Sequence, residues 1–319
     1  MNQGDDIAGT ISKVGSAVLE FKPGDRVAAF HQMWAPNGSY AEYAIAPAST
    51  TFHIPENVSF EEASTLPLAG MTAGLALYQC LRLPTPWAPV PSEQTLPVLI
   101  YGGASAVGAF ALQFAKLSRL NPIITVAGRG IDFVRSLKAA DYIIDYRHED
   151  VPARVKEILK GERLLYAFDA ISSGDTWKIV TDAMGPNYAG AHLNMVDPPK
   201  PLPTWPDGLT FSRTFVASAH GQAHAHRNLE EAAQDQDFAY LFYRCEVQPD
   251  TEADLLTLCH RLWTVYLRDG RLKGHPYEVL PCGLQSVQEG LQALHDKQVS
   301  ARKVVYRIAD TPYLEQWAS

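Results

Sequence analysis

The stretch from Leu96 to Lys116 constrains the fold of this chain more than any other part of the sequence. It begins with an apolar run, Val98 to Tyr101, whose length and composition are typical of a fully buried strand. Gly102 and Gly103 interrupt the run, and residues 109–115 have the small and apolar side chains of a helix packed on a sheet. A strand, a glycine turn and a helix in this order are typical of the start of a dinucleotide-binding unit, because the helix N-terminus offers unpaired N–H groups to a pyrophosphate.

The turn matches the G-x-G-x-x-G fingerprint incompletely. Gly103 and Gly108 occupy the first and last positions, whereas Ser105 stands where the middle glycine is expected. A serine fits if the turn is slightly wider, and its hydroxyl can donate a hydrogen bond to a phosphate. The alternatives are a tight turn of a ligand-free α/β protein and a membrane span, since residues 94–115 carry no charge. The paired glycines and the strand-like first half argue against the span.

After this turn the sequence alternates between short apolar runs and helical segments. The alternation predicts an α/β fold, a parallel sheet with right-handed crossover connections. The predicted strands cover residues 122–126, 142–146, 164–169 and 191–196, with 211–219 as a further candidate. The predicted helices cover residues 131–139, 151–160 and 176–184.

The segments on either side of this region have a different pattern. Near the start, residues 7–15, 26–30 and 40–45 alternate like strands and are separated by glycine and proline turns, which predicts a small β-rich domain. Ser59, followed three residues later by Glu62, predicts the capped start of a helix. Further helices are predicted over 68–81, 238–244, 255–268 and 284–296, a strand over 303–308, and a polar histidine-bearing segment over 221–237.

The composition excludes several classes of protein. The 319 residues suffice for two domains, and a hydrophobic content of 46% supports a sizeable core. The 35 acidic against 27 basic residues give a net charge of -8, which disfavours a nucleic-acid partner. The 4 cysteines lie far apart without a C-x-x-C pair, so no disulfide framework or zinc knuckle is predicted. A reducing, cytoplasmic location is expected, since no basic-then-apolar leader precedes residue 20.

Several short motifs occur in the order typical of the medium-chain dehydrogenase/reductases, and the chain resembles this family over essentially its whole length. The motifs are Gly4–Gly9, Phe21–Val27, Gly38–Tyr43, Leu66–Pro67 with Thr72–Ala73, Tyr101–Gly108 and Arg302–Val305. Within the family the chain is similar to the zinc-free quinone reductase branch, to fungal quinone oxidoreductase-like proteins and to the trans-acting enoyl reductases of polyketide pathways. The resemblance implies a doubly wound Rossmann domain over residues 71–269 and a GroES-like, β-rich catalytic domain over residues 1–70 and 270–319.

Two departures from the family pattern bear on what the resemblance implies. Family members begin several strands earlier, so we expect this chain to lack the N-terminal part of its catalytic domain and part of the substrate wall. Zinc-dependent relatives carry His-Glu where this sequence has Asp5-Asp6, and they carry a four-cysteine lobe that this sequence lacks. No metal is therefore expected. The pattern of His220, His224 and His226 is a weaker alternative, because no carboxylate or cysteine stands at ligand spacing.

The end of the second strand after the glycine turn indicates the cofactor. An NAD enzyme places an acidic residue about twenty residues beyond the glycines, where it accepts a hydrogen bond from the ribose 2′-hydroxyl. In this sequence Ala127-Gly128-Arg129 occupies that place, with no acid before Asp132. An arginine can pair with a 2′-phosphate, so the sequence predicts NADPH. The alternative is a solvated Arg129 in a loop.

The resemblance implies further cofactor contacts. Tyr146 matches a position that contacts the phosphate-ribose end, and Thr72 matches a threonine near the nicotinamide; for each, a packing role is the alternative. Leu193 and Asn194 end the fifth strand, and Lys303 belongs to a tail segment that reaches the cofactor. The predicted cofactor-binding residues are Thr72, Gly103, Ala104, Ser105, Ala106, Val107, Gly108, Ala127, Arg129, Tyr146, Leu193, Asn194 and Lys303.

No residue stands out as an acid or base, so no catalytic residue is predicted. In zinc-free relatives a hydride passes from the nicotinamide to an electron-poor carbon or a quinone oxygen, and the protein mainly orients the reactants in a dry cleft. The resemblance thus implies NADPH-dependent reduction of a quinone or an activated C=C bond in a small molecule, without a membrane partner. The alternatives are a trans-acting enoyl reductase of a polyketide pathway and a catalytically impaired nucleotide-binding paralogue. Relatives commonly pair by joining sheet edges, which leaves a homodimer open.

Overall fold

The computed structural model describes residues 4–223, 227–244 and 262–312. Its contacts divide the chain into two compact units, which we call the discontinuous unit (residues 1–71 and 217–319) and the central unit (residues 72–216). The central unit ends at residue 216, whereas the sequence-based domain limit lies at 269. The assignment of a catalytic and a nucleotide-binding domain stays a prediction.

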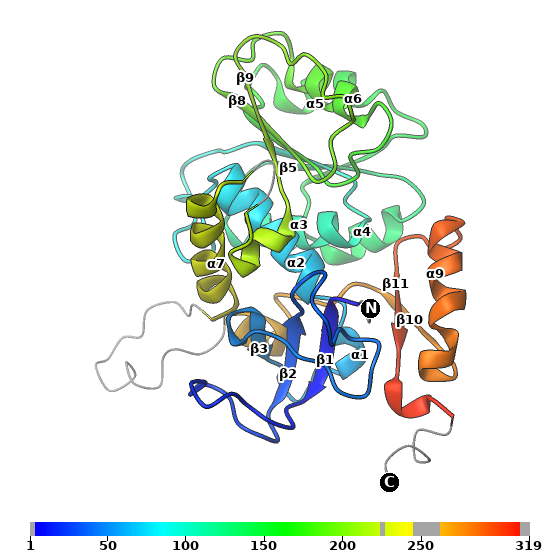
Figure 1. Cartoon of the computed structure of the whole chain (residues 1–319). Helices are drawn as coiled ribbons and strands as arrows, with labels where there is room; N and C mark the ends of the chain where they lie inside the picture. Colours follow the sequence, from blue (N-terminus) through cyan, green and yellow to red (C-terminus); the bar gives the residue numbers. More distant parts are fainter. Residues whose placement is uncertain (1–3, 224–226, 245–261, 313–319) are drawn as a thin grey trace. The chain divides into compact units, whose positions relative to one another are not determined.

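The central unit is built on a six-stranded parallel sheet, which confirms the predicted α/β fold (Figure 1). The strand order is β6-β5-β4-β7-β8-β9. This is the doubly wound order, in which the direction of strand addition reverses between β4 and β7. The strands are β4 (Val98–Tyr101), β5 (Ile123–Ala127), β6 (Tyr142–Asp145), β7 (Tyr166–Asp169), β8 (Ala191–Met195) and β9 (Leu209–Arg213).

Helices cover both faces of this sheet, with α3 and α4 on one face and α5 and α6 on the other (Figure 1). Their bounds are α3 (Ala106–Leu117), α4 (Ile131–Leu137), α5 (Val151–Leu159) and α6 (Thr176–Met184). Asp150 caps α5, since its carboxylate accepts the Ala153 N–H at 2.9 Å. Each helix connects two parallel strands, as the alternation in the sequence predicts.

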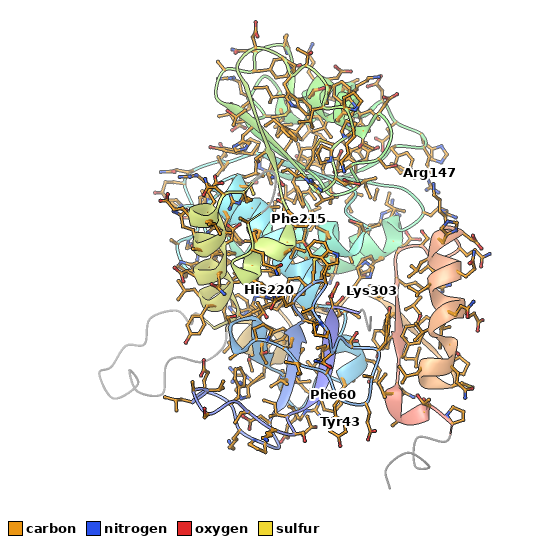
Figure 2. The ribbon with its side chains drawn as sticks, in the orientation of Figure 1. Tyr43, Phe60, Arg147, Phe215, His220 and Lys303 are labelled. Carbon is orange, nitrogen blue, oxygen red and sulfur yellow. The ribbon has the colours of Figure 1, made fainter. Side chains whose placement is uncertain are left out.

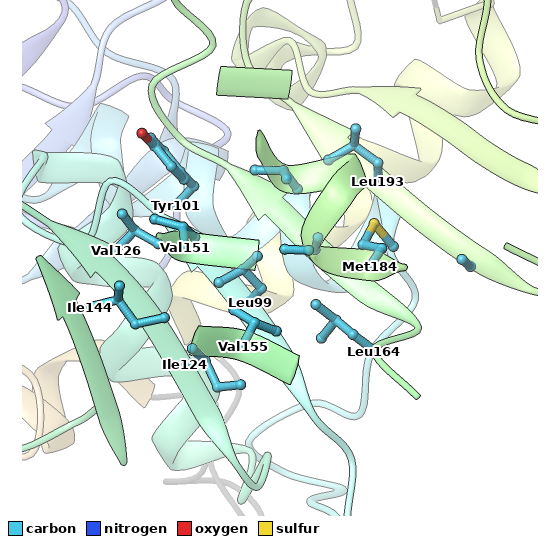
Figure 3. Packing of buried hydrophobic residues seen from close by; sticks show 14 of the residues in the cluster. Leu99, Tyr101, Ile124, Val126, Ile144, Val151, Val155, Leu164, Met184 and Leu193 are labelled. Atoms are coloured by element: carbon cyan, nitrogen blue, oxygen red, sulfur yellow. The ribbon is translucent and has the colours of Figure 1, made fainter. Parts of the chain in front are cut away.

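The core of the central unit explains why the sequence pattern located these strands. Leu99 of β4 and Val126 of β5 pack with Val155 of α5 and Met184 of α6 on one face of the sheet (Figure 3). Side chains of the opposite parity, such as Ile100, are buried as well. A strand that is buried on both faces is a continuous apolar run in the sequence, and such runs are easily recognised.

Two predictions in the central unit change in detail. The helical stretch over 68–81 consists of α2 (Pro67–Gly74), which starts in the discontinuous unit, and the π-helix η2 (Leu75–Cys80). The strand over 211–219 is wrong in extent, because β9 covers 209–213 and a 3-10 helix follows over 216–220. The neighbouring strand β8 ends at Met195, opposite Arg213, and the Thr214 N–H still donates to the Met195 carbonyl oxygen at 2.9 Å before the chain turns into the 3-10 helix.

The discontinuous unit contains the strands of the predicted β-rich part of the chain. An antiparallel sheet has the order β1-β2-β3, with β1 (Asp6–Thr10), β2 (Arg26–Phe30) and β3 (Thr51–His53). A parallel pair is formed by β10 (Tyr277–Leu280) and β11 (Lys303–Tyr306). Asp25 closes the turn before β2, because its carboxylate accepts the Lys22 N–H at 3.0 Å.

The helices of this unit pack around a group of aromatic side chains. They are α1 (Phe60–Ala63), α7 (Leu229–Arg244), α8 (Leu262–Arg268) and α9 (Val287–His295). Trp263 of α8 is fully buried and contacts Phe52, Phe242 and Tyr243. Ser59 caps α1 as predicted, since its hydroxyl oxygen accepts the Glu62 N–H at 3.1 Å. Within the described ranges, no helix combines the length and apolar character that crossing a bilayer requires.

One strand predicted for the discontinuous unit is absent, and one helix begins earlier than predicted. Residues 40–45 form no strand, and because Tyr43 is 68% and Ile45 63% exposed, their alternation has no buried face. The helix predicted over 238–244 is longer than expected, because α7 begins at Leu229, within the polar segment 221–237. Of the helix predicted over 255–268, residues 255–261 lie outside the described residues, and the remainder includes α8.

Candidate functional site

The predicted glycine turn lies where the direction of strand addition reverses in the central sheet. At this point the carboxyl ends of β4 and β7 lie side by side, with Tyr101 opposite Asp169. The turn leaves β4 and leads directly into α3. Open parallel sheets bind their ligands in the crevice outside these strand ends, so the turn occupies the expected ligand position for this fold.

Three glycines in this turn have no room for a side chain. A Cβ on Gly108 would lie 2.2 Å from the carbonyl oxygen of Gly102, which is a main-chain atom that cannot move aside. A Cβ on Gly103 would lie 2.3 Å from Oγ1 of Thr125. Gly102 has a φ of +89°, a conformation that favours glycine. The glycines thus allow α3 to pack directly against the end of β4, which is the role of the last glycine in the fingerprint.

Ser105, at the position of the missing middle glycine, is the N-cap of α3. Its hydroxyl oxygen accepts the Gly108 N–H at 3.0 Å, and its main chain is extended, with a φ of -73° and a ψ of 158°. The serine therefore orients the first turn of the helix. Its hydroxyl hydrogen is not used in this cap bond, so the predicted donation to a phosphate is compatible with the cap.

The first turn of α3 offers unused donors. Among the described residues, the N–H groups of Ala106 and Val107 have no hydrogen-bond acceptor. Both residues, like Ala104 and Ser105 before them, are half-buried rather than covered. Unpaired amides at the N-terminus of a twelve-residue helix attract a phosphate group through hydrogen bonding and through the helix dipole.

Asp169 and Ile171 border the same turn, and neither is among the site residues predicted from the sequence. Ile171 packs over Gly102, since its Cγ1 lies 2.3 Å from where a Cβ on that glycine would be. Asp169 is fully buried and accepts hydrogen bonds from the Ile171 N–H (3.0 Å), the Ser172 N–H (2.8 Å) and the Thr176 hydroxyl (2.6 Å). It fixes the loop after β7. An acidic residue at the end of a buried strand was the signal in the sequence.

The Asp169 carboxyl makes the stability of the chain depend on pH. Burial raises its pKa, although the bonds from Ser172, Thr176 and Ile171 oppose this shift. A carboxyl with a raised pKa in the folded state stabilises the fold below its unfolded pKa, and the contribution is lost as the pH rises through the folded pKa.

We expect Asp169→Asn to remove this dependence. Wild type should therefore lose thermal stability relative to the variant as the pH rises above about 4, the ordinary pKa of aspartate. Melting temperatures of both proteins across this range measure the effect. A difference between the two proteins that does not change with pH would contradict the prediction.

Three predicted residues lie together at the ends of β5 and β6. Ala127 ends β5 and is buried, whereas Arg129 in the following turn is exposed. Tyr146 follows β6, and its ring lies over Gly128, 2.6 Å from where a Cβ on that glycine would be. Arg129 makes no ion pair or side-chain hydrogen bond with any other described residue. Its guanidinium is thus available to an anion.

Other predicted residues are placed where packing occupies their side chains. Leu193 belongs to the core beneath β8, and Thr72 is buried in α2. The amide of Asn194 is bonded at both atoms, since Nδ2 donates to Ser212 Oγ at 2.9 Å and Oδ1 accepts the Thr214 hydroxyl at 2.8 Å. A contact of Leu193 or Asn194 with a ligand would therefore involve their main chain.

Lys303 differs from the other predicted residues, because it belongs to the discontinuous unit. It lies on β11, where Nζ pairs with the carboxylate of Asp6 on β1 and lies 3.4 Å from the carbonyl oxygen of Thr65. The same carboxylate accepts the Leu68 N–H at 2.7 Å. Its predicted contact with the cofactor stays a prediction.

Of the candidate metal ligands of the sequence, His220 lies within the part of the chain that the structure describes. No group of three or more histidine, cysteine, aspartate or glutamate side chains suited to a metal is found within the described residues. His220 packs on Phe30, with ring centroids 4.5 Å apart, and its Nε2 bonds the carbonyl oxygen of His31 at 3.2 Å. Burial lowers the pKa of His220 to about 4. His224 and His226 lie outside the described residues.

Comparison with known sequences relates this chain both to a family profile and to individual proteins. The family profile of the alcohol dehydrogenase GroES-like domain matches residues 1–56. The trans-enoyl reductase fsr4 of Gibberella fujikuroi is 38% identical to this chain over 286 residues, which cover 88% of this chain and 75% of that protein.

Solved structures share the fold of this chain. A quinone oxidoreductase of Pseudomonas syringae superposes with a TM-score of 0.64 at 22% identity, over 95% of this chain and 81% of that one. An Escherichia coli quinone oxidoreductase complexed with NADPH has a TM-score of 0.59 at 21% identity, over 93% and 79% of the two chains. At these identities the likeness concerns the fold alone.

Proposed function

Because this chain belongs to the medium-chain dehydrogenase/reductase family of oxidoreductases, we propose that it is an NADPH-dependent, zinc-independent reductase of an activated C=C bond or a quinone. The name of the 38% identical relative, a trans-enoyl reductase, supports an enoyl group as the acceptor. The quinone oxidoreductases of the same fold support a quinone as the second acceptor class.

The observation that supports nucleotide binding most strongly is the glycine turn with its two unused amides. Gly102, Gly103 and Gly108 keep side chains away from the first turn of α3, and the N–H groups of Ala106 and Val107 have no acceptor among the described residues. Hydrogen-bond donors without steric cover suit a pyrophosphate. The residues present therefore fit a dinucleotide, which this turn would hold by its phosphates.

The preference for NADPH is supported at the other end of the proposed site. Arg129 is exposed and carries no ion pair within the described ranges, so its guanidinium can pair with a 2′-phosphate in a bidentate manner. Tyr146 adds an aromatic surface beside the same turn. An NAD-binding site has an acidic residue after this strand, whereas this chain has Arg129, which no described carboxylate pairs with.

The chemistry of the proposed reaction needs little from the side chains beyond orientation. When bound, the nicotinamide supplies the hydride. Asp169, the carboxylate that borders the turn, is buried and accepts three hydrogen bonds, which suits it to hold the loop after β7 rather than to exchange a proton. We propose no catalytic residue, and the residues of the turn act by positioning the cofactor.

The proposal is tested by binding and turnover with a variant of Arg129. We expect the chain to bind NADPH and to oxidise it when an enone, an enoyl thioester or a quinone is added. Arg129→Gln should weaken NADPH binding about tenfold, since hydrogen bonds between charged groups are the strong ones, and leave NADH binding unchanged. Fluorescence titration and loss of NADPH absorbance are the measurements.

Arg119→Gln is the matched control, because it removes the same charge from an exposed position before β5, at the end of the strand opposite to Arg129. It should bind NADPH like wild type. Failure of wild type to bind either nucleotide would refute the proposal. Binding without turnover on any of the three acceptor classes would favour the nucleotide-binding paralogue instead.

A further inference from the structure

A carboxylate lies beside the turn after β5, Ala127-Gly128-Arg129, although this turn itself contains no acidic residue. Asp145 ends β6, and in the register of the two strands it is the partner of Ala127 at the end of β5. The Tyr146 N–H continues the ladder by donating to the Ala127 carbonyl oxygen at 3.3 Å. The sheet thus brings an acidic side chain next to Ala127-Gly128-Arg129, although Asp145 is distant from this turn in the sequence.

Arg147 covers this carboxylate. Its Nε donates to Oδ1 of Asp145 at 2.8 Å and its Nη2 donates to Oδ2 at 2.6 Å, which is a bidentate pair. The Arg147 N–H adds a third bond to Oδ1 at 3.1 Å. These bonds hold the pKa of Asp145 far below its ordinary value, so the group is ionised at neutral pH. Arg147 projects from the loop after β6, where solvent reaches it (Figure 2).

The turn after β5 and the loop after β6 contact each other. The ring of Tyr146 lies over Gly128, as the 2.6 Å distance to a Cβ on that glycine shows. The contact is flanked by two cations, Arg129 and Arg147, and Arg147 pairs with the carboxylate of Asp145. Two further carboxylates lie nearby: Glu149, which accepts the Asp145 N–H at 2.8 Å and pairs with Arg154, and Asp132, which pairs with Arg135. Each carboxylate around Arg129 thus has an arginine partner, and the partner of Asp145 is Arg147.

We propose that Arg147 is a specificity-determining residue, which neutralises Asp145 so that the adjacent turn accepts a phosphate rather than a ribose hydroxyl. The inference rests on the proposed function. A phosphate monoester carries a charge between about -1.5 and -2 at neutral pH, so an uncovered carboxylate beside it repels it. The same carboxylate favours a hydroxyl, from which it accepts a hydrogen bond. Arg147 thus acts through Asp145 and not on the phosphate.

A double-mutant cycle tests this mechanism. The dissociation constants of NADPH and NADH are measured by fluorescence titration for wild type, Arg147→Gln, Asp145→Asn and the double variant, at one low ionic strength. Arg147→Gln should reduce the preference for NADPH over NADH about fivefold, the effect of a solvent-exposed charge pair. Asp145→Asn should leave the preference within about twofold of wild type, and the double variant should return to that level.

The controls separate this mechanism from others. Arg163→Gln removes an exposed arginine before β7, at the amino ends of the parallel strands and away from the proposed site at their carboxyl ends, and should leave the preference unchanged. The inference is overturned if Arg147→Gln keeps the wild-type preference. It is equally overturned if the double variant stays as low as Arg147→Gln, because Arg147 would then act on the phosphate itself. If wild type binds neither NADPH nor NADH, the proposed function fails and this inference fails with it. That result differs from the two outcomes above, in which wild type binds and the inference alone fails.

Discussion

Replacing Trp263 by alanine is expected to lower the free energy of unfolding by about 4 kcal/mol, since truncating a buried tryptophan typically costs about 3–5 kcal/mol. Trp263 is 0% exposed. Its ring meets those of Tyr243 and Phe242 edge-on, with centroids 4.6 Å and 5.4 Å away, and that of Phe52 at 5.1 Å. The variant would leave a cavity among three aromatic rings. Urea unfolding followed by circular dichroism measures the loss.

Two further variants show whether the effect arises from packing. Trp34 is 56% exposed, so Trp34→Ala should change the free energy of unfolding by no more than about 0.5 kcal/mol. A Cβ on Gly70 would lie 2.4 Å from Cη2 of Trp263. Gly70→Ala should therefore destabilise wild type but not the Trp263→Ala variant. Equal losses from the two tryptophan variants would contradict this account of the core.

The sequence predicted the central unit well because its signals are local. Val98–Tyr101 is buried on both faces, so an apolar run of four residues marks the strand without knowledge of its neighbours. The bounds predicted for α6, residues 176–184, coincide with those in the structure. Segments whose burial is decided by their own periodicity can be located from sequence alone.

The errors occurred where a segment depends on a partner or where a signal was overlooked. Residues 40–45 alternate, but a strand also needs a neighbour to receive its N–H groups, and the sequence does not say whether one exists. The start of α7 was present as a capping box. Asn228 Oδ1 accepts the Glu231 N–H at 2.9 Å, and Glu231 accepts the Asn228 N–H at 3.0 Å. The same capping pattern predicts the start of α1 at Ser59.

The candidate site was only half visible in the sequence, for the same physical reason. Gly103, Gly108 and Arg129 belong to one strand–helix–strand segment and were selected by spacing. Asp145 reaches Arg129's turn only through the pairing of β5 with β6, and Arg147 matters only because of Asp145. Relations that sheet register creates between distant residues require the structure.

Gly108→Ala is expected to lower the free energy of unfolding by about 2 kcal/mol, the usual range for overpacking, and to abolish nucleotide binding. The new Cβ would lie 2.2 Å from the Gly102 carbonyl oxygen and 3.1 Å from Cα of Gly103, so α3 must move away from β4. Such a shift also moves the amides of Ala106 and Val107, which are the proposed phosphate donors. Chemical denaturation and NADPH titration measure the two effects.

Gly9→Ala separates the geometric effect from the removal of a glycine as such. No atom lies within 4 Å of a Cβ on Gly9, which is on β1, and alanine there should be neutral or slightly stabilising. In a helix such as α3, alanine is intrinsically more favourable than glycine by about 1 kcal/mol. Any loss of stability in Gly108→Ala must therefore come from the steric clash and not from helix propensity. A Gly108→Ala protein that binds NADPH as tightly as wild type would show that the first turn of α3 does not hold the phosphates.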